Sequence, residues 1–378
     1  MRLSGERFAV VYRLTGDQAG ALAKAEDICL EQTVEFPAEL VPAGFIKNEV
    51  LGRIEEFSTA GGGAYLATIS YATETAAGEL TQLLNVIFGN ISIKPGIRVE
   101  SLRLPASLLD CFRGPRFGRA GLRRLLKAPQ RPLLATALKP MGLSADELAE
   151  LAYKCALGGI DIIKDDHGLT DQCFAPFAKR VKACAAAVAR ANRETGGASV
   201  YVANVTAGPR DIFRRAALAK EYGAGGLLVA PALVGLDTMR ALADDDALGL
   251  PVISHPAFQG SYVIGGDGLS HYALYGQIAR LAGADATIYP NFGGRFSFSK
   301  AECSSIVDGT AAPMENVRPI FPCPGGGMSL ERVPELLEVY GRDVIFLIGG
   351  GLFKHGPDLV ANCRYFRDLV SAAAGKRP

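Results

Sequence analysis

Residues 133–167 read LLATALKPMGLSADELAELAYKCALGGIDIIKDDH, in which two short apolar runs flank a helical stretch. Leu133–Lys139 and Ile160–Asp165 predict β-strands, and Ala145–Leu157 predicts the helix that joins them. The same alternation continues along the rest of the chain. It gives eight candidate strands, at Leu133–Lys139, Ile160–Asp165, Val200–Val205, Gly226–Ala230, Pro251–Ser254, Ala286–Tyr289, Pro319–Pro322 and Val344–Ile348.

Strands that are apolar throughout and alternate with helices are typical of a parallel sheet covered by those helices. Eight such units close into a (β/α)₈ TIM barrel, and we predict this α/β fold for residues 116–378. An open doubly wound sheet is the alternative, but the GxGxxG turn typical of that fold is missing. Further helices are predicted at Phe177–Arg193, Ile212–Tyr222, Tyr272–Leu281, Leu330–Tyr340 and Leu359–Ala373.

The first 115 residues have a different pattern, with alternating strands and fewer helices. Phe8–Leu14, Val50–Phe57 and Tyr65–Ala72 predict strands, and the glycines at 61–63 predict a hairpin turn between the last two. Helices are expected near 20–30 and 75–85. We therefore predict a smaller α+β domain of the ferredoxin-like type over residues 1–115, linked to the barrel by a basic connector, Arg113–Arg131.

The composition limits the classes of ligand. With 40 basic and 39 acidic residues among 378, the net charge is +1, which argues against nucleic acid and anionic membranes and favours a small-molecule substrate. The eight cysteines form no CxxC pair, as expected for free thiols in a reducing compartment. We find neither a signal peptide nor about 18 consecutive apolar residues, and so expect a cytoplasmic protein without membrane contact.

Ionisable residues gather where the predicted strands end, which is the edge that carries the active site in barrels of this class. Lys139 ends the first strand, Lys164 the second, and His255 follows the fifth. A single lysine at a strand end is usually a surface residue with its ammonium in water. Two at adjacent strand ends, beside Asp166 and His167, indicate a site for chemistry.

The second strand suggests a metal site. Alternation puts Lys164 and Asp166 on one side, whereas Asp165 points the other way and is expected to form an ion pair with a lysine or arginine. A bare ammonium would repel a cation, but a neutral lysine can react with CO₂ to give an anionic carbamate. Lys164 as a carbamate, Asp166 and His167 are therefore candidate ligands of a divalent metal, with a hydrogen-bonded loop role as an equal alternative for His167.

The last two strands suggest a phosphate site. The seventh runs into Gly325, Gly326 and Gly327, and the eighth into Gly349 and Gly350. Glycine lets backbone N–H groups approach an anion, and many barrels hold phosphate at these two loops. Arg295, after the sixth strand, is a candidate clamp for a second anionic group, with a solvated arginine as the alternative.

In combination these motifs resemble the large-subunit family of ribulose bisphosphate carboxylase. The resemblance rests on Leu138–Pro140, Gly158–Asp161 with Lys164–Asp166, Asn204–Gly208 and the two glycine runs, and it extends to 31–33 and 88–90. It implies a homodimer in which each first domain completes the partner's site. By resemblance, Lys164 is the carbamylated metal ligand, and Asp166 and His167 take the other two ligand positions. Lys139 handles protons, His255 lies near the substrate, and Glu31, Thr33 and Asn90 reach in from the partner.

Departures from the family argue against CO₂ fixation. His167 stands where the family has a glutamate, so Mg²⁺ is implied by resemblance while Mn²⁺ or Zn²⁺ are alternatives. Met141 replaces a lysine of the carboxylases, and Gly293–Lys300 does not reproduce their lysine-bearing loop. The chain is therefore similar to the non-carboxylating RuBisCO-like proteins of form IV.

Shared chemistry in this family is an enediolate held by a cation next to a phosphate. Asn90 occupies the position of a lysine in the methionine-salvage relatives, so we favour decarboxylation of a 3-oxo sugar-acid phosphate, of the 3-oxo-isoapionate 4-phosphate type. One alternative is an enolase or isomerase of a 5-methylthioribulose 1-phosphate type substrate. Others are an inactive sugar-phosphate-binding protein and an aldolase with Lys139 or Lys164 as Schiff base.

Overall fold

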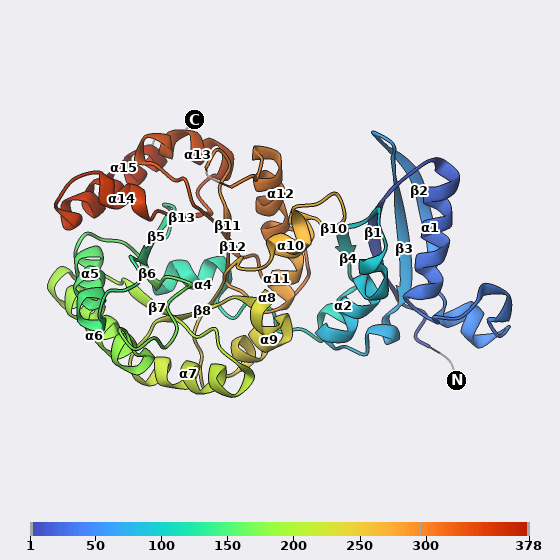
Figure 1. The fold of residues 1–378 in the computed structure, drawn as a ribbon, viewed down its shortest axis with the longest axis horizontal. Coiled ribbons are helices and arrows are strands. Elements are labelled where there is room, and N and C mark those ends of the chain that lie inside the picture. The colour runs from blue at the N-terminus through green and yellow to red at the C-terminus, as the bar shows by residue number, and fades with distance from the viewer. Residues whose placement is uncertain (1–2, 295, 376–378) are drawn as a thin grey trace.

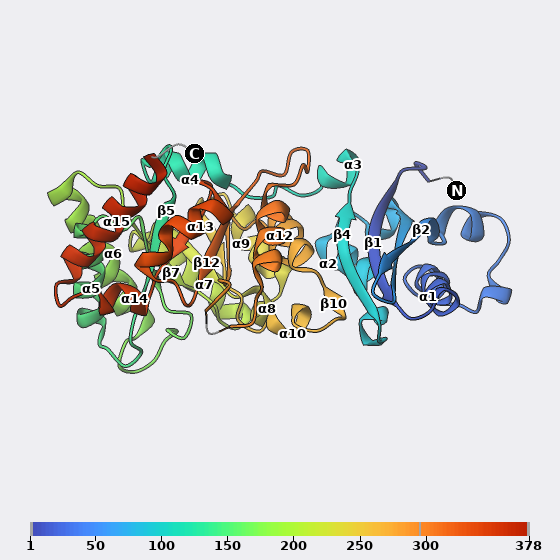
Figure 2. The ribbon, with the colours of Figure 1, turned by 90° about the horizontal axis from the view of Figure 1, so that it is seen from above.

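A computed structural model describes residues 3–294 and 296–375 and places two bodies side by side along the long axis (Figure 1). The view from above shows the same arrangement, with the N-terminal sheet at one end and the barrel at the other (Figure 2). Within the described residues, no helix combines the length and apolarity needed to cross a membrane.

The predicted barrel is confirmed. Its eight parallel strands close in the order β11-β12-β13-β5-β6-β7-β8-β9. Lys164 of β6 lies in register with Ala137 of β5 and Val202 of β7, so the carboxyl ends of these strands meet at one rim. The strands are β5 (Leu133–Leu138), β6 (Ile162–Asp165), β7 (Val200–Asn204), β8 (Gly226–Val229), β9 (Val252–Ser254), β11 (Ala286–Pro290), β12 (Phe321–Gly325) and β13 (Ile345–Leu347).

Helices surround the barrel (Figure 1). The predicted helix Ala145–Leu157 is observed with those limits, because Ser144 and Glu147 form a capping box at its first turn. The segment predicted as one helix at Tyr272–Leu281 instead begins as a π-helix, Tyr272–Ile278. The helices are α5 (Ala145–Leu157), α6 (Phe177–Thr195), α7 (Pro209–Glu221), α8 (Pro231–Val234), α9 (Leu236–Asp244), α10 (Gly260–Val263), α11 (Ala279–Leu281), α12 (Lys300–Ala311), α13 (Val333–Tyr340), α14 (Gly350–Lys354) and α15 (Leu359–Gly375).

The π-helix packs unusually close to α12. A Cβ atom at Gly276 would lie 2.5 Å from the backbone of Gly309, so the two helices come this close only because both have glycine at the contact. A π-helix has i→i+5 hydrogen bonds and is rare. The apolar periodicity of a segment this short does not distinguish it from an α-helix.

The N-terminal body is an α+β domain with a five-stranded sheet in the order β10-β4-β1-β3-β2. Its elements are β1 (Arg7–Thr15), α1 (Gln18–Glu31), β2 (Arg53–Gly61), β3 (Ala64–Ala72), α2 (Leu80–Phe88), β4 (Ile97–Arg103), β10 (Gly268–Leu269) and the short α3 (Ala106–Leu109). The three glycines at 61–63 join β2 and β3 with positive φ angles, as predicted for the hairpin. β2 begins three residues later than expected because a π-helix occupies Ile46–Val50.

One edge strand of this sheet comes from the barrel half. β10 pairs in parallel with β4, with Gly268 opposite Arg98 and Leu269 opposite Val99. Neither β4 nor β10 was predicted from the sequence. The division of the chain between residues 115 and 116, which falls between α3 and α4 (Gly118–Leu125), stays a prediction.

The basic connector closes the amino-terminal end of the barrel. Leu122, Leu126 and Ala128 pack against the inward-facing residues of the strands, such as Leu133 and Ile162. Its charged groups bind aspartates in the loops that lead into the strands: Arg131 to Asp161, Arg116 to Asp246 and Arg123 to Asp343, each at 2.7 Å. Because this end is sealed, substrate access is left to the opposite rim, where the strands end.

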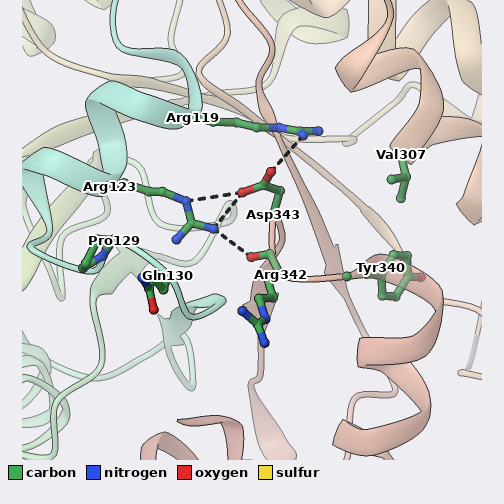
Figure 3. Close-up of a pocket in the computed structure, with 9 residues that line it drawn as sticks. Arg119, Arg123, Pro129, Gln130, Val307, Tyr340, Arg342 and Asp343 are labelled. Atoms are coloured by element: carbon green, nitrogen blue, oxygen red, sulfur yellow. Dashed lines mark hydrogen bonds and ion pairs between the residues drawn. The ribbon is translucent and has the colours of Figure 1, made fainter. Parts of the chain in front are cut away.

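A cavity of about 580 Å³ lies beside the connector, at the sealed end (Figure 3). Arg119 and Arg123 line it, but both already bind Asp343, and Arg123 also donates to the carbonyls of Ala128 and Arg131. These guanidinium groups therefore stabilise the sealed amino-terminal end of the barrel, which we call its floor. The cavity is separate from the candidate active site.

Candidate active site

The structure brings the ionisable residues predicted from the strand ends together at one rim. Lys139 Nζ lies 2.7 Å from Asp166 Oδ2, and His167 Nδ1 lies 3.2 Å from Asp166 Oδ1. The rings of His167 and His255 stack, with 4.4 Å between centroids. Groups from β5, β6 and β9 thus form one cluster around the carboxylate of Asp166.

Lys164 is the most enclosed member of the cluster. Lys164 is only 2% exposed, and its Nζ donates a hydrogen bond to the carbonyl of Asp165 at 3.0 Å. Burial lowers the pKa of Lys164 to about 8, although the nearby Asp166 carboxylate acts in the opposite direction. A sizeable fraction of neutral amine is therefore present near physiological pH, which is the form that reacts with CO₂.

Asp166 is held as a carboxylate. Burial alone would raise its pKa, but the hydrogen bonds from His167 and Lys139 and the charge of Lys164 hold that pKa well below its usual range. Lys139 is less enclosed than Lys164, with 42% of its side chain exposed. Its ammonium is therefore free to contact a molecule that enters the rim.

The two histidines differ in their surroundings. His255 is partly buried, and its Nδ1 accepts a hydrogen bond from the backbone N–H of Ala257 at 3.1 Å. Burial and the charge of Lys164 lower the pKa of His255 well below its ordinary value, so it is a neutral ring with its proton on Nε2. His167 has 49% of its side chain exposed and, with Nδ1 turned to Asp166, leaves Nε2 available as a ligand.

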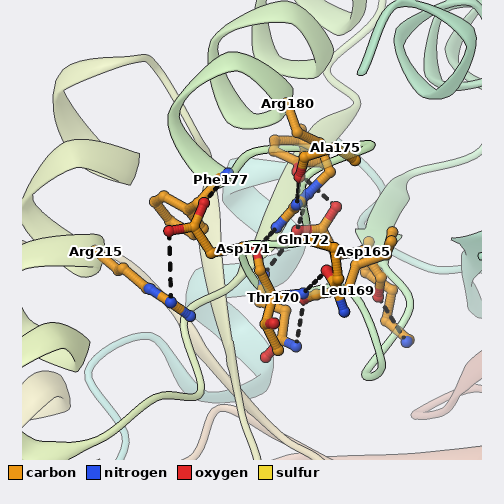
Figure 4. Close-up of polar contacts among 12 residues, drawn as sticks. Asp165, Leu169, Thr170, Asp171, Gln172, Ala175, Phe177, Arg180 and Arg215 are labelled. Carbon is orange, nitrogen blue, oxygen red and sulfur yellow. Dashed lines mark hydrogen bonds and ion pairs between the residues drawn. The ribbon is translucent and has the colours of Figure 1, made fainter. Parts of the chain in front are cut away.

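Asp165 points away from the rim, as strand alternation predicted. Its carboxylate forms a fully buried ion pair with Arg180 of α6 at 3.2 Å, which confirms the expected ion pair (Figure 4). It also accepts hydrogen bonds from the hydroxyl of Tyr201 and the backbone N–H of Asn204. Sequence analysis named neither Arg180 nor Tyr201; an arginine one turn after Phe177, on the apolar face of a helix, was the available signal.

The two glycine runs meet beside the cluster. A Cβ at Gly351 would lie 2.8 Å from the carbonyl oxygen of Met328, so the loops after β12 and β13 are neighbours. Gly326 and Gly327 have φ angles of 77° and 72°, which favour glycine, and the positions of Gly349 and Gly350 border open space. Gly325 ends β12 itself. Arg295, the predicted clamp, lies outside the described residues.

Lys164 and the glycine loops belong to strands of the same barrel. The thiol of Cys323, on β12, is close enough to influence the pKa of Lys164. The strands that carry the two groups run parallel and end at the same rim. Both parts of the predicted site therefore lie at one end of the molecule.

The residues predicted to come from a partner lie in the N-terminal domain, away from the barrel cluster of their own chain. Asn90 donates from its side-chain amide to Glu31 at 3.1 Å and to Glu35 at 3.2 Å. Thr33 donates to the carbonyl of Cys29 just after α1. Glu31 and Asn90 are thus adjacent to each other, and sequence analysis did not name Glu35, which joins them.

The donor set fits a divalent ion on one condition. Among the described residues, no three histidine, cysteine or acidic side chains form a group able to hold a metal. Asp166 and His167 supply two ligands, and Lys164 supplies a third only when a carbamate replaces its ammonium. Burial and the lowered pKa of Lys164 favour that modification, so these three residues fit the metal when Lys164 is carbamylated.

The similarity to known proteins extends over both the N-terminal domain and the barrel. Residues 118–375 match the family described as "Ribulose bisphosphate carboxylase large chain, catalytic domain". The chain is 37% identical to 5-methylthioribulose-1-phosphate isomerase of Rhodospirillum rubrum, covering 98% of each, and 31% identical to 2,3-diketo-5-methylthiopentyl-1-phosphate enolase of Bacillus licheniformis, covering 97% and 92%. A crystal structure of a Rubisco-like protein from Rhodopseudomonas palustris aligns with a TM-score of 0.87 at 39% identity, covering 98% and 99%.

Proposed function

Because the chain belongs to the ribulose bisphosphate carboxylase large-chain family, we propose that it is a non-carboxylating enzyme that isomerises or enolises a phosphorylated ketose. The observation that carries the proposal is the convergence of Lys139, Lys164, Asp166, His167 and His255 at the rim that also bears the glycine loops. The names of similar proteins support the enolase or isomerase alternative better than the decarboxylase favoured from the sequence.

Each part of the site has a role in this proposal. Lys164 as a carbamate, Asp166 and His167 would hold a divalent ion, Mg²⁺ by resemblance, or Mn²⁺ or Zn²⁺ because of the imidazole. When bound, such an ion stabilises negative charge that develops on substrate oxygens. Backbone N–H groups at Gly325–Gly327 and at Gly349 and Gly350 hold the phosphate of the substrate.

Side chains of the protein itself move the protons in this proposal. Lys139 is the more exposed of the two lysines at the rim. As the neutral amine it accepts the proton from the substrate carbon next to the carbonyl, and as the ammonium that results it returns a proton to the enediolate. His255, neutral and protonated on Nε2, donates a hydrogen bond to a substrate oxygen. The two act on an anion whose charge grows during the reaction, so stabilisation is strongest at the transition state.

We also propose a homodimer with shared sites. Glu31 and Asn90 form a polar group on the N-terminal domain that contacts nothing in the barrel cluster of the same chain, as far as the described contacts go. A second copy that lays this group over the rim would add it to the site. Thr33 lies beside it, at the end of α1.

Proton exchange tests the proposed function. Purified enzyme with bicarbonate and Mg²⁺ or Mn²⁺ is incubated in D₂O with 5-methylthioribulose 1-phosphate and related ketose phosphates, and NMR follows deuterium uptake and conversion. Exchange at the carbon next to the carbonyl supports the proposal. Release of CO₂ from a 3-oxo sugar-acid phosphate, without deuterium exchange into the ketose phosphates, would favour the decarboxylase. Binding of these compounds without any turnover would favour the binding protein. Trapping of a covalent adduct with borohydride would reveal a Schiff-base aldolase.

A further inference from the structure

The loop between β6 and α6, residues 166–176, carries two of the three proposed metal ligands. Two arginines lie against it, Arg180 on α6 and Arg215 on α7, and both guanidinium groups lie near the ring of Phe177, at 5.6 and 5.4 Å (Figure 4). The arginines resemble each other in charge and in aromatic contact. They differ in what their nitrogens bind.

Arg180 binds the strand and the loop at once. Its Nε donates to Oδ2 of Asp165 at 3.2 Å, while its terminal nitrogens donate to the carbonyls of Ala175 at 2.7 Å and Thr170 at 2.8 Å. The side chain is completely buried. One planar group therefore fixes the end of β6 relative to two points of the loop that follows it.

The network continues to the ligand residue itself. The backbone N–H of Asn204 donates to Asp165, and the side-chain amide of Asn204 donates to the carbonyls of His167 and Leu169, both at 2.9 Å. The backbone at His167 is thus held from β7, and the rest of the loop is held from α6. Asp165, between Lys164 and Asp166 in the sequence, is the carboxylate on which both anchors converge.

Arg215 makes only a long contact with the loop. It lies 3.9 Å from the carboxylate of Asp171 and donates to the carbonyl of Thr206 at 3.3 Å. Neither Asp165 nor a carbonyl of residues 166–176 is among its hydrogen-bond partners. It therefore provides a natural control for charge and for stacking on Phe177.

We infer that Arg180 is a positioning residue for the active site, which sets the placement of Asp166 and His167 relative to Lys164 through Asp165 and the loop carbonyls. The inference rests on the proposed function. A buried ion pair is often no more stabilising than an apolar pair of the same size, so stability alone gives no reason for a buried arginine here. Placing ligands before the substrate arrives does give one, because ligand geometry must be held closely.

The test compares Arg180→Lys with the matched variant Arg215→Lys. Lysine keeps the positive charge opposite Asp165 but lacks the fork that reaches three acceptors. We expect Arg180→Lys to weaken Mn²⁺ binding in the presence of bicarbonate by about tenfold or more, as measured by calorimetry. Backbone amides of residues 166–176 should exchange with deuterium faster, and kcat should fall more than KM rises. Arg215→Lys should stay near wild type in all three readouts.

Wild-type Mn²⁺ affinity and wild-type loop exchange in Arg180→Lys would overturn the inference, since the whole role of Arg180 would then be to compensate the charge of Asp165. If Arg180→Lys does not fold, the double variant Asp165→Asn with Arg180→Met removes both charges and keeps the volume. It should fold and still bind Mn²⁺ weakly, and wild-type affinity in it would equally overturn the inference. A wild-type enzyme that binds Mn²⁺ but processes no ketose phosphate would instead overturn the proposed function and leave the positioning role standing.

Discussion

The ammonium of Lys139 and the carboxylate of Asp166 are joined by an ion pair of 2.7 Å, although the two residues directly follow different strands of the barrel, β5 and β6. Asp166 therefore has two roles in the proposed site, as a metal ligand and as the partner of the proton-transfer group. A cation near Asp166 and the ammonium of Lys139 compete for the same carboxylate, and this competition makes the two roles separable by mutation.

Replacing Lys139 by methionine should abolish turnover without abolishing metal binding. We expect kcat to fall by about 10²-fold or more, because the group that transfers the proton is lost. Mn²⁺ affinity should be unchanged or higher, because a competing cation is removed. Calorimetry and proton exchange measure the two effects. Lys179→Met, at an exposed lysine of α6 paired with Asp146, is the control, and a joint loss of binding and turnover would contradict the assignment.

Activation by bicarbonate should follow the ionisation of Lys164. Its pKa is lowered from 10.5 to about 8, so the reactive neutral amine appears as pH rises through about 8. Bicarbonate-dependent activity should therefore rise between pH 7 and 9, and Lys164→Ala should abolish it while far-ultraviolet circular dichroism stays native. Full activity in Lys164→Ala would refute the carbamate.

The same lowered pKa has a consequence for stability. Between pH values of about 8 and 10.5 the unfolded chain binds more protons at Lys164 than the folded one, so the free energy of unfolding rises with pH in that window. Below about pH 8 both states are protonated and the contribution is constant. Denaturation of wild type and Lys164→Ala across this range shows the difference.

His167 should determine the choice of metal. An imidazole ligand favours Mn²⁺ and Zn²⁺ more than an all-oxygen site does, whereas a carboxylate suits Mg²⁺. His167→Glu should therefore increase affinity for Mg²⁺ relative to Zn²⁺, as measured by competitive titration with bicarbonate present. An unchanged ratio would mean that the imidazole is not a ligand and that its contact with Asp166 is its main role.

Mixing two inactive variants tests the shared site. Lys164→Ala damages the barrel, and Glu31→Ala damages the polar group on the N-terminal domain. After unfolding and refolding together, random pairing gives mixed dimers in which one of the two sites is intact, so activity should recover to about a quarter of wild type. Each variant refolded alone is the control. Absence of recovery, with mixed dimers present, would place Glu31 outside the partner's site.

The floor of the barrel should affect stability and leave catalysis unchanged. Arg123 donates to the carbonyls of Ala128, Arg131 and Arg342 and pairs with Asp343. Arg123→Ala removes the hydrogen bonds to the three carbonyls, while Asp343 keeps its contact with Arg119, and should lower the free energy of unfolding by about 2–3 kcal/mol. Arg124→Ala, at the exposed neighbouring position, should change it by less than about 0.5 kcal/mol. A large loss of kcat in Arg123→Ala would show that the floor influences the rim.

The barrel and its rim could be predicted because their signals are local. Each strand is an apolar run bounded by a turn, and parallel pairing then brings all carboxyl ends to one side. The alternation of Lys164, Asp165 and Asp166 further placed Asp165 on the opposite face, where its ion pair is found. These inferences require only neighbouring residues and a fixed geometry.

What sequence reasoning missed depends on contacts between distant segments. Arg180 meets Thr170 and Asp165 only after α6 has packed on the barrel, and Asn204 reaches His167 from another strand. β10 is two residues long in a glycine-rich segment and is a strand only because β4 is beside it. A short run without periodicity carries no strand signal of its own.

The pairing of β10 with β4 ties the two halves of the molecule together through the backbone. A barrel expressed without residues 1–115 would leave Gly268 and Leu269 with unpaired N–H and C=O groups, and the isolated N-terminal half would expose the free edge of β4. An exposed edge of this kind invites self-association. Each half expressed alone should therefore self-associate more readily than the whole chain.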